Sequence, residues 1–200
     1  MGNQTRNIGS ATLAVILTVV AHGQDENASD GIEVLAPFNV IGQKSDVLEL
    51  EGAGTVLDVE DLKPFFHVDV TEILRQAPGV YIRPEEGYGL FPNVSLRGVD
   101  PNRSTKVTIM EDGIPSSPSP FSDPAAYYSP TAGRMAGFEI LKGSSQLRFG
   151  PNTTGGVINY LSTPIPQDHR TSHLRVSYGE HNERIGHAYS GGKTALGGGT

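Results

Sequence analysis

The sequence contains no cysteine, which excludes disulfide bonds, thiolate catalysis and metal sites with cysteine ligands. Basic side chains are outnumbered: 15 Lys and Arg stand against 22 Asp and Glu, and the net charge is -7 at pH 7. This balance argues against nucleic acid as a partner. Long apolar runs are also missing, because the apolar stretch at residues 8–20 is too short to span a bilayer comfortably as a helix.

Residue patterns typical of catalysis are missing as well. Ser144 and Ser145 lack the Gly-x-Ser-x-Gly context of a nucleophile elbow. The segment 150–156 lacks the Lys-Ser/Thr pair of a phosphate-binding loop. The histidines are scattered, and we expect them to be solvated surface residues and not metal ligands: His67, His169, His173, His181 and His187. We therefore expect no enzyme activity, no metal site and no cofactor.

The N-terminus has the pattern of a secretory signal peptide at residues 1–23. Arg6 supplies the positive charge, residues 8–20 form the apolar part, and Ala21 and Gly23 are small residues at the two positions that a signal peptidase reads. Acidic and polar sequence follows at once, so we expect cleavage after Gly23 and export. An N-terminal membrane anchor or a buried helix is the alternative.

What the chain has in abundance is turn-forming residues, with 25 glycines and 14 prolines. Short apolar runs in residues 92–165 end at these residues, which predicts brief strands joined by tight turns. Asp112-Gly113 predicts a hairpin, and Gly155-Gly156 predicts a close approach of two backbones. Further strands are expected at 55–59 and 80–83. A short helix is expected over 72–76, capped by Asp69 or Thr71 and ended by Pro78-Gly79.

Four blocks in fixed order carry a family resemblance: Leu-Arg-Gly at 96–98, Met-Glu-Asp-Gly-Ile-Pro at 110–115, Glu-Ile-Leu-Lys-Gly at 139–143 and Phe-Gly-Pro-Asn-Thr-Thr-Gly-Gly-Val-Ile-Asn at 149–159. Together they resemble the plug domain of TonB-dependent outer-membrane receptors. The resemblance covers about residues 32–168 and is greatest to the ferric dicitrate receptors, partly through residues 162–168. It implies an α+β plug domain with a small mixed sheet at residues 40–166.

After Pro166 the pattern changes to alternation. Leu174, Val176 and Tyr178 alternate with Arg175 and Ser177, which is the period of a membrane β-strand with one apolar face. A return strand is expected at 185–190 after a turn at 179–182. We therefore expect residues 167–200 to be the first strands of a truncated transmembrane β-barrel, because a barrel that encloses a plug has about 22 strands.

The resemblance implies a transporter in the outer membrane of a Gram-negative bacterium. Such a receptor takes up a ferric chelate, with ferric citrate the first choice, and its partner is TonB of the TonB-ExbB-ExbD energy complex. The plug gates the barrel. Two alternatives remain open. One is an exported, non-transporting binding module, and the other is a receptor for another siderophore, haem, cobalamin or a saccharide.

The resemblance also implies an energy-coupling segment, the TonB box, within a mobile N-terminus at residues 24–39. We place it at Ile32, Glu33, Val34, Leu35 and Ala36. An extended segment of this kind can add as a strand to the exposed sheet edge of a partner. The alternative is that these residues form the first strand of the plug, a role for which residues 38–42 compete.

Two loops, residues 84–91 and 116–130, are candidates for ligand contact. Cations flank the first loop and aromatic side chains occur in both, so we assign ligand binding to Arg83, Tyr88, Phe91, Arg103, Phe121 and Tyr127. The alternative is that the aromatic residues cover the plug core or touch the barrel wall. Arg97 and Arg148 are candidates for charged hydrogen bonds that lock the plug to the barrel. The alternative for both is a partner within the plug, such as Asp112 or Glu139 for Arg97.

Overall fold

A computed structural model describes the backbone of residues 15–17 and residues 39–62, 69–86, 89–116, 129–150, 153–166 and 170–192. The chain divides into two compact units. One comprises residues 35–164, and the other comprises residues 1–34 with 165–200. Among the described residues, there is no helix with the length and apolar character that a membrane span requires.

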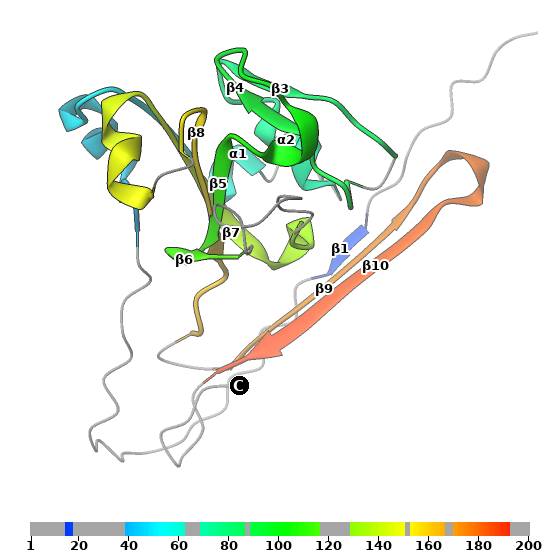
Figure 1. The fold of residues 1–200 in the computed structure, drawn as a ribbon. Coiled ribbons are helices and arrows are strands. Elements are labelled where there is room, and N and C mark those ends of the chain that lie inside the picture. The colour runs from blue at the N-terminus through cyan, green and yellow to red at the C-terminus, as the bar shows by residue number, and fades with distance from the viewer. Residues whose placement is uncertain are drawn as a thin grey trace, which may run out of the picture. The chain divides into compact units, whose positions relative to one another are not determined.

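The first unit is built on a mixed sheet with the strand order β2-β7-β8-β5-β6 (Figure 1). β5 and β8 run parallel, and the other neighbouring pairs are antiparallel. The small mixed sheet predicted from the sequence is therefore confirmed. Its strands are β2 (Ala53–Leu57), β5 (Val107–Glu111), β6 (Ile114–Pro115), β7 (Met135–Lys142) and β8 (Gly156–Ser162).

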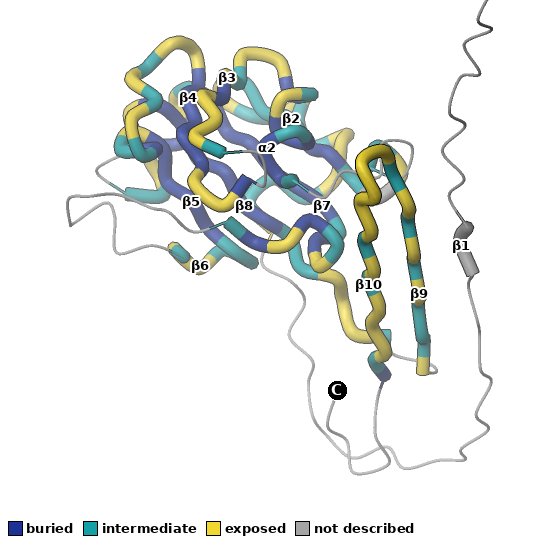
Figure 2. Tube along the Cα trace, turned by 90° about the vertical axis from the view of Figure 1, so that its right-hand side faces the viewer, coloured by how far each residue is buried: buried dark blue, intermediate teal, exposed yellow. Residues whose placement is uncertain are grey.

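One face of this sheet is covered by the helix α2 (Val70–Leu74) and the hairpin β3 (Val80–Ile82) and β4 (Val94–Leu96). α2 begins at Asp69, whose side chain accepts a hydrogen bond from the Thr71 amide at 2.6 Å, as the sequence predicts. The helix α1 (Val59–Leu62) follows β2. The buried core on this face includes Ile73 and Leu74 of α2, as expected, and Phe138 and Tyr160, whose rings meet edge to face at 5.4 Å. In Figure 2 the buried parts of β7 and β8 are dark blue.

The opposite face of the sheet packs against 3-10 turns and irregular chain. η1 (Lys44–Glu49) lies before β2, and η4 (Ser144–Phe149) follows β7. Met110, Leu141 and Val157 form the buried cluster here, with Val40, Ile41, Leu50 and Phe149 packed against it. Residues 39–42 form no strand, so the reading of residues 38–42 as the first strand of the plug is wrong over the part that is described.

Two turn predictions are confirmed. Asp112 and Gly113 have φ of 49° and 80° between the paired residues Glu111 and Ile114, as a tight hairpin with right-handed strand twist requires. Gly156 has φ of 143°, and a Cβ there would lie 2.5 Å from the Leu141 carbonyl oxygen. The predicted close approach is therefore real. Two further 3-10 turns are η2 (Asn102–Ser104) and η3 (Ala132–Arg134).

The second unit contains the antiparallel strands β9 (Thr171–Tyr178) and β10 (Arg184–Gly191), joined by η5 (Glu180–Asn182). Leu174, Val176 and Tyr178 are exposed on one face of β9, so the alternation and the return strand are confirmed. A third strand, β1 (Val15–Leu17), pairs with β9. β1 lies inside the predicted signal peptide, whose cleavage stays a prediction.

Candidate functional site

Two cations lie together at the end of the first unit where β4 and β7 finish. Arg97 follows β4 with φ of 55°, is exposed, and donates its backbone N–H to the Gly79 carbonyl at 2.9 Å. Lys142 ends β7 and is only 5% exposed; its Nζ donates to the Pro78 carbonyl at 2.7 Å and to Thr55 Oγ1 at 3.1 Å. Burial lowers the pKa of Lys142 below its ordinary value, and the nearby charge of Arg97 lowers it further.

The two partners named as alternatives for Arg97 within the plug bond to other groups. The Asp112 carboxylate accepts hydrogen bonds from the backbone and side chain of Ser162, and Glu139 is engaged elsewhere, so neither is the partner of Arg97. Among the described residues, Arg97 makes no ion pair. A positive φ in a bulky residue is strained, and such strain is concentrated at functional positions.

Lys142 is a residue that the sequence reasoning missed. Its signal was present, because Lys142 closes the Glu-Ile-Leu-Lys-Gly block directly before a glycine with φ of 106°. Arg148, the second predicted lock residue, is exposed in the last turn of η4. It has no ion pair with any carboxylate in the part of the chain that the structure describes.

The predicted ligand residues Arg83 and Arg103 both bond to Asn93. The Arg83 amide donates to the Asn93 backbone carbonyl at 3.0 Å, and the Arg103 amide donates to Asn93 Oδ1 at 2.7 Å. The Asn93 side chain, fully buried, also donates to Glu85 at 2.8 Å. Asn93 therefore holds the first loop and the segment around Arg103 together, a role that nothing local in the sequence signals.

Of the other predicted ligand-contact residues, Phe91 lies in the described part of the chain. Phe91 is 44% exposed beside this Asn93 cluster. The Glu85 carboxylate accepts from Asn93, and the Glu86 carboxylate accepts from the Leu90 amide. Both acids thus bond to their own loop. Outside the described residues lie Tyr88, Phe121, Tyr127 and the coupling segment Ile32, Glu33, Val34, Leu35 and Ala36.

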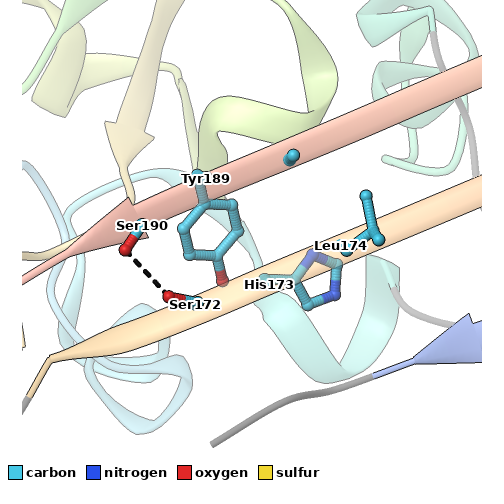
Figure 3. A pocket seen from close by; sticks show the side chains of 6 residues that line it. Ser172, His173, Leu174, Tyr189 and Ser190 are labelled. Atoms are coloured by element: carbon cyan, nitrogen blue, oxygen red, sulfur yellow. Dashed lines mark hydrogen bonds between the residues drawn. The ribbon is translucent and has the colours of Figure 1, made fainter. Parts of the chain in front are cut away.

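The hairpin of the second unit gathers aromatic rings on one face. His173 pairs with Tyr189 across the strands, and their rings stack at 5.1 Å (Figure 3). His187 lies diagonally opposite, with 6.2 Å between the two imidazole centroids. The expectation that these histidines are scattered is therefore wrong for this pair, because strand register brings them together. Across the described residues, no group of three or more His, Cys, Asp or Glu side chains could hold a metal ion.

The fold and the order of these elements match a known family. Residues 46–157 match the model of the TonB-dependent receptor plug domain, and the chain belongs to this family.

The chain is also similar to two individual proteins. An iron-regulated outer membrane virulence protein of Vibrio cholerae serotype O1 is 26% identical over 161 residues, which is 76% of this chain and 23% of the relative. The crystal structure of the ferric citrate transporter FecA in the unliganded form is similar with a TM-score of 0.59 and 26% identity, covering 76% of this chain and 27% of that one. The chain spans about a quarter of the length of these relatives.

Proposed function

We propose that this chain is the plug and the opening strands of an outer-membrane receptor that takes up an anionic ferric chelate with energy from TonB. The observation that carries the proposal is the plug domain itself, matched over residues 46–157. Ferric citrate is the first choice of ligand, because the resemblance at residues 162–168 and the similarity to a ferric citrate transporter favour it. The receptor works without a covalent step.

The ligand contacts the loop end of the plug. Arg83 and Arg103 supply positive charge there, and Asn93 fixes the backbone of both. Glu85 and Glu86 accept hydrogen bonds from Asn93 and from the Leu90 amide, so both carboxylates are held by groups of the plug. The aromatic side chains Tyr88, Phe91, Phe121 and Tyr127 supply rigid amphipathic surface around these cations.

Arg97 locks the plug to the barrel wall. Arg97 is exposed and makes no ion pair among the described residues, so its guanidinium is accessible to a carboxylate of the barrel, whereas Lys142 is buried and bonds to Pro78 and Thr55 within the plug. A guanidinium binds a carboxylate in a bidentate manner, which fixes orientation as well as distance. Arg148 serves as a second contact of the same kind.

TonB captures the segment Ile32 to Ala36 by strand addition once ligand is bound. Force derived from the inner-membrane proton gradient then shifts the plug and opens a path for the chelate. In this sequence of events, ligand contact and energy coupling take place at separate parts of the chain.

Uptake by the full-length gene tests the ligand. A strain that lacks its own ferric citrate receptor is grown under iron limitation and given radioactive iron as citrate, as other siderophores or as haem. Uptake from citrate alone supports the first choice. Uptake from a different chelate keeps the receptor and changes its ligand, and no uptake from any ferric compound contradicts the proposal.

The loop assignment has its own test in the same receptor. We expect the double substitution of Tyr88 and Phe91 by Ala, and that of Phe121 and Tyr127, each to weaken ligand binding at least tenfold, because each removes two contact surfaces. The control is Leu147→Ala in η4, which removes an exposed apolar side chain outside both loops. Unchanged affinity in both double variants, with normal membrane assembly, would place the site on the barrel.

A further inference from the structure

Glu139 lies at the centre of the sheet on β7 and is fully buried. One carboxylate oxygen accepts from the Val40 amide at 2.6 Å and from Asn159 Nδ2 at 2.8 Å. The other accepts from the amides of Ile41 and Gly42 at 2.9 Å and 2.8 Å. Every one of these groups is a donor, and each carboxylate oxygen accepts from two of them.

Three successive backbone amides converge on one anion here. Gly42, which carries the third of these amides, has φ of 100°, a conformation that residues with a side chain rarely adopt. Asn159 fixes the carboxylate from the sheet side. Its own Oδ1 accepts from the Gly113 amide at 2.9 Å, so the Asn159 amide cannot turn over without losing that bond.

Apart from the hydrogen bonds to Glu139, few polar contacts hold residues 40–50, which we name the strap, on the sheet. The strap pairs with no strand. Val40, Ile41 and Leu50 pack against the buried cluster on this face, and Lys44 forms ion pairs with Asp58 and Asp61 at 2.9 Å and 2.7 Å. These ion pairs are exposed and contribute little. The four hydrogen bonds of Glu139 are therefore the main polar attachment of the strap.

We propose that Glu139 is a positioning residue for energy coupling. It holds the strap on the plug and thereby limits how far the chain before the sheet can extend toward TonB, to whose sheet edge residues 32–36 add as a strand. A released strap of eleven residues adds about 36 Å of reach at 3.3 Å per residue. This inference rests on the proposed function, but its first measurement does not.

Glu139→Gln tests this attachment of the strap, because glutamine has almost the same shape as glutamate. Whichever side the new amide nitrogen takes, it meets two donors: Val40 and Asn159 on one side, or Ile41 and Gly42 on the other. At least two hydrogen bonds are lost. The matched control is Glu111→Gln, which removes the ion pair of Glu111 with Arg134 elsewhere on the sheet.

The first measurement is amide hydrogen exchange of the purified full-length receptor without ligand. In Glu139→Gln we expect exchange in peptide 40–46 to rise at least tenfold, with no change in peptide 157–162 of β8. Glu111→Gln should change neither peptide. An unchanged strap, or an equal rise in both peptides, overturns the proposal, because the second outcome means general destabilisation.

Gly42→Ala gives the same test from the strap side if Glu139→Gln does not accumulate. A Cβ at Gly42 is strained at this φ and would lie 2.7 Å from Asp46 Oδ2, while the buried sheet is left intact. We expect the same selective rise in exchange. A strap that exchanges at the wild-type rate in this variant counts against the proposal in the same way.

The second measurement is affinity for the purified periplasmic domain of TonB, again without ligand. Glu139→Gln should bind at least threefold more tightly than the wild type, whereas a misfolded plug would bind less tightly. Equal or weaker binding overturns the coupling role even if exchange rises. Neither result bears on whether the receptor transports a ferric chelate, which the uptake assay decides.

Discussion

Gly156 begins β8 at the point where that strand passes closest to its neighbours. Its φ is 143°, and a Cβ would meet Leu96 Cδ1 and lie 2.5 Å from the Leu141 carbonyl oxygen. Gly98 also has positive φ, 83°, but nothing lies within 4 Å of its Cβ position. The two glycines therefore separate the cost of backbone conformation from the cost of a clash.

We expect Gly156→Ala to destabilise the plug by about 2–5 kcal/mol, since the strain of a positive φ costs about 1–2 kcal/mol and overpacking about 1–3 kcal/mol. Gly98→Ala should cost about 1–2 kcal/mol, because only the strain applies. Urea unfolding of the fragment 40–166 measures both. Equal losses in the two variants would mean that the close approach at Gly156 relaxes at no cost.

At the scale of the element, the hairpin β9–β10 has two unlike faces. Leu174, Val176 and Tyr178 lie on one face, while Arg175 and Ser177 lie on the other. If this hairpin opens a membrane barrel, the apolar face meets lipid. A charge placed there then costs about 2–4 kcal/mol at mid-depth, whereas one on the polar face costs little.

We accordingly expect Val176→Arg to reduce the amount of folded full-length receptor in the outer membrane severalfold. Ser177→Arg, one residue further along the same strand, should leave that amount unchanged. The measurement is the quantity of folded receptor in isolated outer membranes. Loss in both variants, or in neither, would contradict the assignment of the two faces.

At the scale of the whole molecule, we predict that energy coupling and ligand binding can be separated by a substitution. Val34→Pro removes a backbone donor from the segment Ile32 to Ala36 and so blocks strand addition. We expect uptake of ferric chelate to be lost while ligand binding at the cell surface survives. Both are measured with radioactive iron on the same cells.

The control for Val34→Pro is Ala28→Pro, the same change in the acidic stretch before the segment. It should leave uptake intact, because it removes no donor from the proposed pairing strand. Normal uptake in Val34→Pro would show that residues 32–36 are not the coupling segment. Loss of surface binding together with uptake would instead point to failed assembly of the receptor.

The sequence by itself determined the features that depend on neighbours along the chain. Asp69 caps α2, Asp112-Gly113 turns a hairpin, and the alternation at Leu174 to Tyr178 predicts a strand with two faces. Each rests on residues a few positions apart, where backbone preference and side-chain period act directly. The order of four short blocks was enough for the family.

Only the tertiary structure decided which distant residues meet. Glu139 accepts from amides 97 to 99 positions away, and Lys142 donates to the Pro78 carbonyl 64 positions away. His173 and His187 come together only through strand register. No local pattern encodes such pairings, because a buried charge takes whichever donors or acceptors the packed sheet brings to it. For the same reason the sequence marks Lys142 only as the end of the Glu-Ile-Leu-Lys-Gly block, and its bonds to Pro78 and Thr55 became visible only in the fold.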